Sequence, residues 1–316
     1  MKSITIGSDP EFMLKDPNGN LVSAIGRVPG SKEERFAVEN GHFVYYDNVL
    51  AECNIKEASS AEGFVENVRD CLTQYAGVVK PNQLVIQASG KYPVNECKHK
   101  DANVFGCDPE LDAYKLAVND PPVCAKGNTF RTAGGHLHIG YEGGAAIEGD
   151  DDANYKVQIN RLFLVRFCDL VIGIPSLFMD KDPSSKERRR LYGGAGTNRE
   201  CLAYGVEYRS LGNFWLRSPS SVTLMYNLAQ YCVDQVVEQN VGTHLYDDFD
   251  GSYQQADTPF NVFDWREVPN IINDWDLKAG QKVLDQLFNI LPKNLCDGIK
   301  EEASKEYWPE LLKCWK

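Results

Sequence analysis

The sequence predicts an α+β fold built around an antiparallel sheet. Segments with the periodicity of strands and segments with that of helices are mixed along the 316 residues, without the strict alternation of a doubly wound parallel sheet. The chain also opens on a hairpin. Strand-like segments at residues 2–7 and 9–14 are followed by the turn sequence Asp16-Pro17-Asn18-Gly19 and by an apolar stretch from Leu21.

The remaining elements follow from the same periodicities. Further strands are expected at residues 43–55, 84–89, 134–140 and 205–211, and helices at 61–79, 155–172 and 220–238, with two more from 277 onward. The first helix begins at the capping box Ser59-Ser60-Ala61-Glu62. Residues 94–133 show little periodicity, and a loop of that length in a compact domain is usually functional. We expect one domain over residues 1–316, with a helical part from about 217 to 316 packed on the rest.

Composition and charge argue against several classes of protein. With 43% hydrophobic and 25% charged residues the chain is typical of a soluble globular protein, and its net charge of −12 argues against general nucleic-acid binding. The apolar run at 162–179 carries Arg166 and Asp169 and is too short and too charged to span a membrane. The start lacks the pattern of a signal peptide, and none of the ten cysteines forms C-x-x-C. We therefore expect buried free thiols and a cytoplasmic protein.

Four expected strands carry polar residues at positions i and i+2, which share one face of a strand. The pairs are Asp9 and Glu11, Glu52 and Asn54, His136 and His138, and Glu207 and Arg209. Taken singly, such a pair is also typical of a solvated face or of a cross-strand ion pair. Together on one sheet, these carboxylates would repel one another without cations, and a mostly carboxylate set with one or two histidines suits Mg²⁺ or Mn²⁺.

A basic triplet leads into a glycine-rich stretch just before the last of these pairs. It consists of Arg188, Arg189 and Arg190, with Gly194, Gly196 and Arg199 following. Glycines let backbone amides approach an anion, and arginine presents a fork that matches phosphate oxygens, so the stretch predicts a polyphosphate-binding element. The alternative is a solvated, flexible loop.

The order of these motifs resembles the tailed-phage carboxylate-amine ligases, or amidoligases, of the glutamine synthetase and glutamate-cysteine ligase superfamily. The motifs are D-P-E, E-x-N, G-G-H-x-H, a Y-G-x-x-G loop ending in arginine, and G-V-E-Y-R with N-F-W, over about residues 7–215. The resemblance implies a curved antiparallel sheet with helices packed on its outer face, which is the glutamine-synthetase-like catalytic domain.

The resemblance also implies roles for individual residues. It implies metal ligands at Asp9, Glu11, Glu52, His136 and Glu207. It implies that His138 touches ATP phosphate, and that Arg199 and Arg209 act with Glu207 on the transferred phosphoryl group. Asp9 departs from the glutamine synthetases, which have Glu at that position.

The activity implied is ATP-dependent and requires Mg²⁺ or Mn²⁺: a carboxylate is phosphorylated to an acyl phosphate, which an amine then attacks. Amino acids, peptides, a protein side chain or a modified nucleobase remain open as carboxylate substrate and amine acceptor, and the oligomeric state is open too. Two alternatives are a guanidino-kinase-like phosphotransferase and a non-catalytic metal-binding phage protein.

Overall fold

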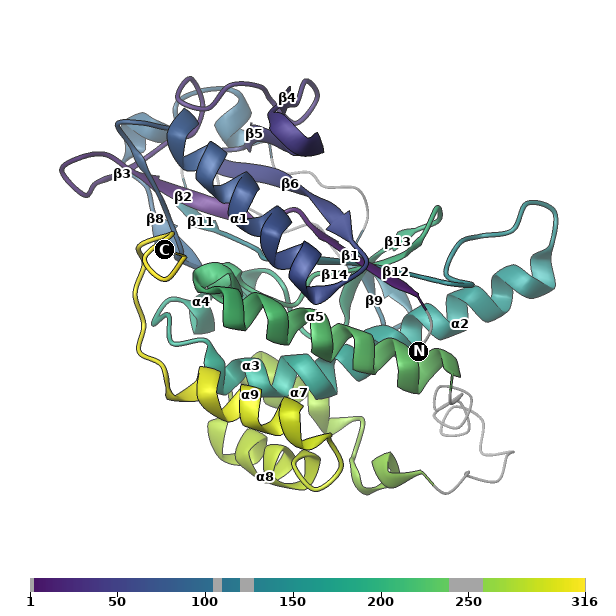
Figure 1. Cartoon of the computed structure of the whole chain (residues 1–316). Helices are drawn as coiled ribbons and strands as arrows, with labels where there is room; N and C mark the ends of the chain where they lie inside the picture. The colour runs from purple at the N-terminus through teal and green to yellow at the C-terminus, as the bar shows by residue number, and fades with distance from the viewer. Residues whose placement is uncertain (1–2, 105–109, 120–127, 239–257, 316) are drawn as a thin grey trace.

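The computed structural model describes residues 3–104, 110–119, 128–238 and 258–315. In these residues one sheet of 12 strands has the order β10-β9-β13-β14-β12-β1-β6-β2-β3, with β5 and β7 pairing to its β6 and β2 strands and β4 pairing to β5. All its named strand pairs are antiparallel, and helices cover one face (Figure 1). The α+β prediction with an antiparallel sheet is confirmed.

Five strands form the centre of the sheet: β13 (Thr197–Cys201), β14 (Gly205–Tyr208), β12 (Leu137–Tyr141), β1 (Ile4–Ser8) and β6 (Leu50–Ala58). The outer strands are β2 (Glu11–Lys15), β3 (Leu21–Val22), β4 (Phe36–Ala37), β5 (Phe43–Asp47), β7 (Gln83–Val85), β9 (Leu111–Asp112) and β10 (Ala117–Val118). A separate two-stranded sheet consists of β8 (Ser89–Lys91) and β11 (Phe130–Thr132).

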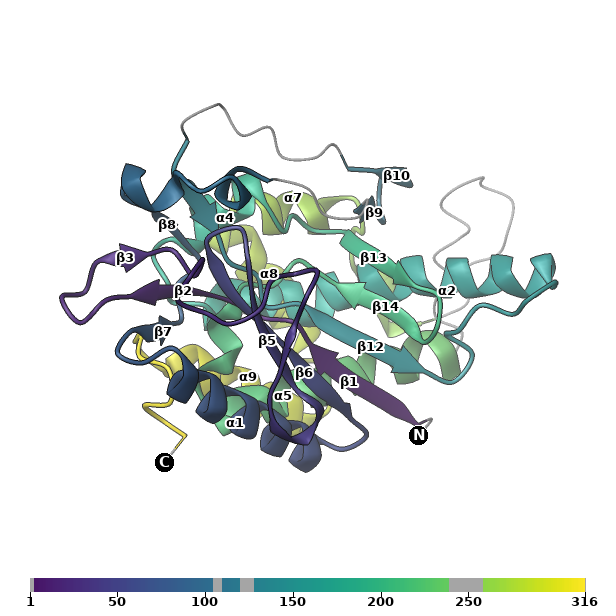
Figure 2. The same ribbon diagram turned by 90° about the horizontal axis from the view of Figure 1, so that it is seen from above.

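The helices are α1 (Ala61–Val78), α2 (Asp151–Cys168), α3 (Ile174–Met179), α4 (Ser185–Leu191), α5 (Pro219–Val233), α7 (Glu267–Asp274), α8 (Leu277–Leu287) and α9 (Lys293–Ser304). Helices α1, α2 and α5 contact the sheet, while α8 and α9 contact α3 and form a further layer (Figure 1). Figure 2 looks onto the opposite face, where β5, β6, β1, β12, β14 and β13 lie in front of the helices. That uncovered face carries the candidate site.

Helix α1 shows how the sequence specifies a covering helix. The hydroxyl of Ser60 accepts a hydrogen bond from the amide of Gly63 at 3.0 Å, which satisfies one of the free amides of the first turn. Its buried side chains recur every three or four residues, so they form one apolar stripe: Phe64, Val68, Cys71, Leu72 and Tyr75. The predicted helix is confirmed, with Ser60 rather than Ser59 as its cap.

The strand predictions need correction in three places. The β2–β3 hairpin is confirmed, but β1 does not pair with β2, because β6 lies between them. Residues 43–55 are two strands rather than one. Asn48, with φ of 57°, turns the chain back on itself between β5 and β6. The expected strand at 84–89 is also divided, between β7 and β8.

The stretch predicted as a phosphate-binding loop has regular structure over most of its length. Helix α4 contains the arginine triplet, and β13 pairs with both β14 and β9. Of the long segment at 94–133, residues 105–109 and 120–127 lie outside the described part, and the rest holds β9, β10, β11 and two short 3-10 turns at 94–97 and 101–103.

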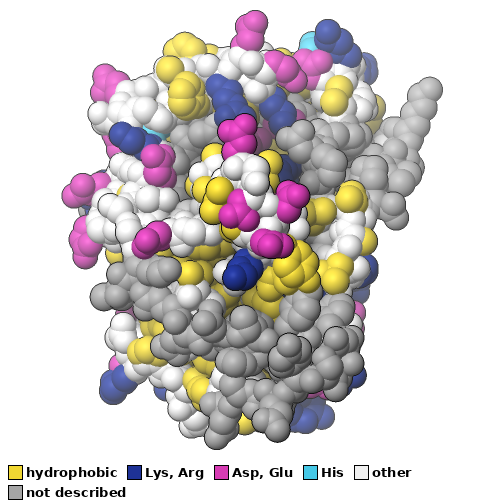
Figure 3. All heavy atoms as spheres, turned by 90° about the vertical axis from the view of Figure 1, so that its right-hand side faces the viewer, with side chains coloured by type: hydrophobic (Ala, Val, Ile, Leu, Met, Phe, Trp, Pro, Cys, Tyr) yellow, Lys and Arg dark blue, Asp and Glu magenta, His cyan; other side chains and the backbone are white. Residues whose placement is uncertain are grey.

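The prediction that the run at 162–179 is too short and too charged to span a membrane needs correction, because the helical stretch Asp151–Met179 that contains it is long and apolar enough by length and composition. However, 89% of its apolar window is buried inside the protein. Packing in the core therefore accounts for its apolar character. The eight cysteines in the described residues are all free, as predicted, and six of them are buried. On the end of the molecule shown in Figure 3, acidic and basic side chains lie next to one another among the described residues.

Candidate active site

Strand register assembles the site on the uncovered face. Arg199 in β13 lies opposite Glu207 in β14, Glu207 lies opposite His138 in β12, and His138 lies opposite Gly7 in β1. Because residues opposite one another in a ladder point to the same face, this row places a guanidinium, a carboxylate and an imidazole side by side. The intervening residues, such as Ile139 and Val206, point into the core.

Asp9, His136 and Glu207 form the centre of the site. Asp9 Oδ1 lies 3.2 Å from His136 Nδ1, and Glu207 Oε1 lies 3.3 Å from the same nitrogen. Their ligand atoms all lie within 4.8 Å of one another, and all three residues are buried. Asp9 Oδ1 also lies 3.1 Å from His138 Nε2. The sequence prediction that these four side chains gather is confirmed, while their roles stay predictions.

The electrostatics of this centre suit a cation. Asp9 Oδ1, His136 Nδ1 and His138 Nε2 are buried, and although Asp9 Oδ1 lies 3.2 Å and 3.1 Å from the two nitrogens, none of the three atoms is in a well-aligned hydrogen bond. Burial raises the pKa of Asp9, but the charges and contacts of His138 and His136 outweigh it and hold that pKa well below the usual range. Burial lowers the pKa of His136 and of His138, but the neighbouring carboxylates outweigh it and raise both pKa values. The centre therefore holds a charged carboxylate in ion-pair contact with two buried imidazoles. Carboxylate oxygens with one histidine nitrogen are donors that Mg²⁺ or Mn²⁺ accepts.

Glu11 and Glu52 lie opposite each other in strands β2 and β6. Glu11 accepts a hydrogen bond from the amide of Gly134 at 2.6 Å, and Glu52 accepts one from the hydroxyl of Tyr45 at 2.7 Å. Burial, followed by the charges of Asp9 and Glu11, raises the pKa of Glu52 well above its usual range. The two glutamates thus crowd further carboxyl groups beside the centre, where burial raises their pKa values, although the tight three-residue cluster does not include them.

The two arginines predicted to act on phosphate lie at the site. Arg199 donates to Glu207 Oε2 at 2.9 Å, and Arg209 forms an ion pair with Glu207 and another with Glu110 at 2.8 Å. Arg209 is 2% exposed, whereas the side chain of Arg199 is 23% exposed. Arg199 is therefore the one that an incoming anion reaches more easily.

Two tyrosines complete the site, and sequence reasoning assigned neither a role. The hydroxyl of Tyr192 accepts a hydrogen bond from Arg209 and lies 3.2 Å from His136 Nε2. The Tyr192 hydroxyl can accept from Arg209 and still either accept from or donate to His136 Nε2, while His136 Nδ1 faces Asp9 and Glu207. The hydroxyl of Tyr204 is hydrogen-bonded to His138 Nδ1. Only the Y-G-x-x-G motif signalled Tyr192, and no pattern signalled Tyr204.

The arginine triplet is not assembled with this centre. Arg188 is 1% exposed, and its guanidinium donates to the carbonyls of Ala133, Ser210 and Leu211. Arg189 is also buried, with its guanidinium 5.5 Å from the ring centre of Trp275, and Arg190 is exposed.

The glycines that follow are also engaged inside the protein. The amides of Ala195 and Gly196 donate to Asn273 and Asp169 at 2.7 and 2.6 Å, and a Cβ at Gly194 would lie 3.2 Å from Asn273. Internal partners satisfy the Arg188 guanidinium and the Gly196 amide, so the geometry gives no support to a contact of these two residues with phosphate. The predicted phosphate contacts of Arg189 and Gly194 stay predictions.

A pocket of about 300 Å³ opens beside His138. Its lining includes Thr5, Gly7, Asn54, His138, Gly140 and Tyr204. Its volume lies at the lower end of the range of small-molecule sites.

Residues 125–294 match the family model described as "Phage phiEco32-like COOH.NH2 ligase-type 2". The match covers more than half of the chain. The chain belongs to this family. The match includes His136, His138, Arg199, Glu207 and Arg209 and extends into the C-terminal helices, whereas the resemblance in the sequence motifs ran from about residue 7 to 215.

Comparison with solved structures finds the crystal structure of a bifunctional glutathione synthetase from Pasteurella multocida, with a TM-score of 0.46 and 10% identity. The alignment covers 96% of this chain and 46% of that one, so the chain spans less than half the length of the matched protein. No curated protein matches the chain. Membership of the COOH-NH2 ligase family implies a carbon–nitrogen ligase that acts on a carboxylate and an amine.

Proposed function

We propose that this protein uses ATP and a divalent metal ion, Mg²⁺ or Mn²⁺, to activate a carboxylate as an acyl phosphate and to join it to an amine. The observation that carries the proposal is the convergence of Asp9, His136 and Glu207 within 4.8 Å, with Arg199 and Arg209 both paired to Glu207. Phosphoryl transfer needs this combination, because charge spread over the phosphoryl oxygens is stabilised by cations and arginines.

Asp9, His136 and Glu207 would hold the metal ion, with Glu11 and Glu52 as further carboxyl groups beside it that a bound cation would favour in the charged form. When bound, the metal would neutralise charge on the phosphate oxygens of ATP. Tyr192 would hold His136 with Nδ1 toward the carboxylates, which is the orientation that a metal ligand needs.

Arg199 and Arg209 would bind the transferred phosphoryl group. In the described structure both arginines are paired with Glu207, so a bound cation that draws this carboxylate away would release Arg199 toward phosphate oxygens, while Arg209 would keep its ion pair with Glu110. ATP would lie in the pocket beside His138, since that imidazole lines the pocket and also contacts Asp9.

The reaction itself requires no covalent nucleophile from the protein. The carboxylate oxygen of the substrate attacks the γ-phosphorus and ADP leaves; the amine then attacks the carbonyl carbon, and phosphate leaves with the carboxylate oxygen. The protein orients the reactants and stabilises charge. We further propose that the chain forms one domain of the glutamine-synthetase-like kind and works in the cytoplasm, which the eight free cysteines of the described residues support.

Mass spectrometry of the product tests the proposal. The full chain is incubated with ATP, Mg²⁺ and a mixture of amino acids and peptides, with EDTA as the control. We expect ADP together with a product whose mass equals the sum of two components less one water, and neither product in EDTA. A phosphorylated component without condensation would instead indicate a phosphotransferase, and binding without turnover would indicate a non-catalytic protein.

A further inference from the structure

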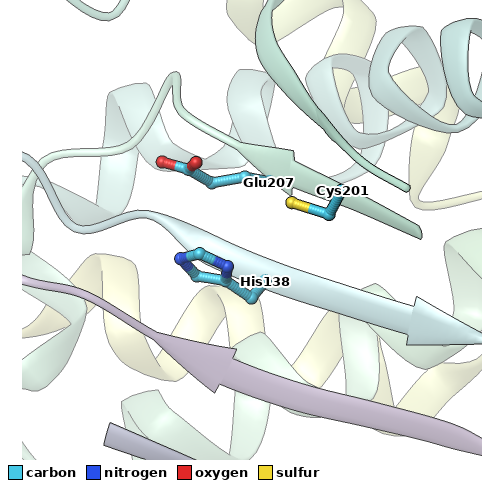
Figure 4. A group of neighbouring side chains, drawn as sticks. All are labelled: His138, Cys201 and Glu207. Carbon is cyan, nitrogen blue, oxygen red and sulfur yellow. The ribbon is translucent and has the colours of Figure 1, made fainter. Parts of the chain in front are cut away.

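A thiol lies beside the proposed metal centre. Cys201 in β13, His138 in β12 and Glu207 in β14 each offer one ligand atom, and these three atoms lie within 4.8 Å of one another. Figure 4 shows the three side chains on the same side of the sheet. Glu207 belongs both to this group and to the cluster with Asp9 and His136.

Two glycines explain how the thiol reaches the imidazole. Cys201 lies opposite Gly205, and Gly205 lies opposite Gly140. Neither glycine has a side chain to fill the space between β13 and β12. A Cβ at Gly205 would come within 2.2 Å of the Ile139 carbonyl oxygen, so the backbone there requires glycine. No side chain at these two positions separates Cys201 from His138, and their ligand atoms lie within 4.8 Å of each other.

The donor set differs in kind from that of the neighbouring centre. Sulfur, imidazole nitrogen and one carboxylate oxygen are donors that Zn²⁺ takes, at about 2.0–2.3 Å each. Magnesium takes oxygen ligands, and a thiolate favours softer ions. Three protein ligands are the number found in the open form of a zinc site.

We propose that His138, Cys201 and Glu207 form a second cation site that takes thiophilic divalent ions, zinc in particular. Because Glu207 is shared, zinc there and Mg²⁺ at the first centre compete for the same carboxylate. Zinc binding stands independently of the proposed function; its inhibition of ATP turnover rests on that function.

Cobalt(II) is a suitable probe, because a thiolate ligand gives it a near-ultraviolet charge-transfer band. Metal-free full-length protein is titrated with Co²⁺ as wild type, Cys201→Ser and Cys314→Ser. Cys314 is exposed and belongs to neither cluster, so it is the matched control. We expect the band in the wild type and in Cys314→Ser and its loss in Cys201→Ser. Zinc affinity should fall by at least about tenfold in Cys201→Ser, since even the loss of an outer-shell partner costs about 10–100-fold.

A band that persists in Cys201→Ser, or equal zinc affinity in folded Cys201→Ser and wild type, would overturn the inference. Circular dichroism establishes folding, and Cys201→Ala serves as a second variant if the serine form is unstable. In turnover assays with Mg²⁺, zinc should inhibit the wild type more strongly than Cys201→Ser. A protein that binds cobalt through Cys201 but never forms ADP would contradict the proposed function and leave this site standing.

Discussion

Replacing Glu207 by glutamine should show how much the charge of this residue contributes to stability and how much it contributes to catalysis. Glu207 is 1% exposed and is paired with Arg199, Arg209 and His136. Burial and the charge of Asp9 raise its pKa, but His136 and Arg209 outweigh them and lower it to about 2. A carboxyl pKa of about 2 in place of 4.5 corresponds to about 3 kcal/mol in favour of the charged form.

Glu207→Gln should therefore destabilise the metal-free protein by about 3 kcal/mol, in line with the cost of breaking a buried ion pair. Because the folded pKa is depressed, this stabilisation is present above pH 4.5 and is lost as the pH falls toward 2. If Glu207 also holds the metal, ADP formation should fall by about 10²-fold or more under conditions where the variant is folded.

Glu302→Gln is the matched control. Glu302 is 2% exposed and is paired with Arg217 at 2.9 Å, in helix α9 and outside the site. We expect both variants to lose stability in urea titrations, whereas only Glu207→Gln loses turnover. Equal ADP formation by folded Glu207→Gln and Glu302→Gln would refute the assignment of Glu207 to the metal centre.

Three further predictions address other parts of the structure. Tyr192→Phe removes the hydroxyl that lies between His136 and Arg209. ADP formation should fall by about tenfold, which is the equivalent of one hydrogen bond to a charged group, while the melting temperature changes little. Unchanged kinetics would refute the positioning role of Tyr192. Arg188→Met should destabilise the protein by about 3 kcal/mol, measured by urea titration, because three carbonyls lose their hydrogen-bond donor. The ATP affinity of the folded variant should be unchanged. Weaker ATP binding would indicate that Arg188 binds phosphate after all. Burial raises the pKa of Asp169 to about 6, so this carboxyl should add about 1 kcal/mol to the free energy of unfolding as the pH falls from 7 to 5. Asp169→Asn should remove that increment. Identical dependence of stability on pH in the variant and the wild type would contradict the prediction.

Strand periodicity accounts for most of what the sequence predicted correctly. Alternation placed Asp9, His136, His138 and Glu207 on one face, and the register of the antiparallel sheet brings them together. The contact of Cys201 with this group escaped prediction because it depends on which strand lies next to which, and β13 was not expected.

The arginine triplet shows that a run of charged residues in a sequence does not by itself predict which side chains are exposed. Three consecutive arginines suggest an exposed basic surface, yet only Arg190 is exposed. Arg188 is buried because its planar guanidinium satisfies three carbonyls where strands and loops end, a demand that appears only once the chain is folded. Likewise Gly196 is needed because a Cβ would lie 2.7 Å from Tyr114 and its φ is +79°, rather than to admit a phosphate.

Oxygen transfer tests the proposed chemistry most directly. Amino acids with both carboxyl oxygens labelled with ¹⁸O are incubated with the protein, ATP and Mg²⁺, and the released phosphate is examined by mass spectrometry. If the carboxylate is activated as an acyl phosphate, each phosphate released with a ligation product carries one ¹⁸O, and folded Glu207→Gln releases almost none. Unlabelled phosphate formed together with an amide product would contradict the account.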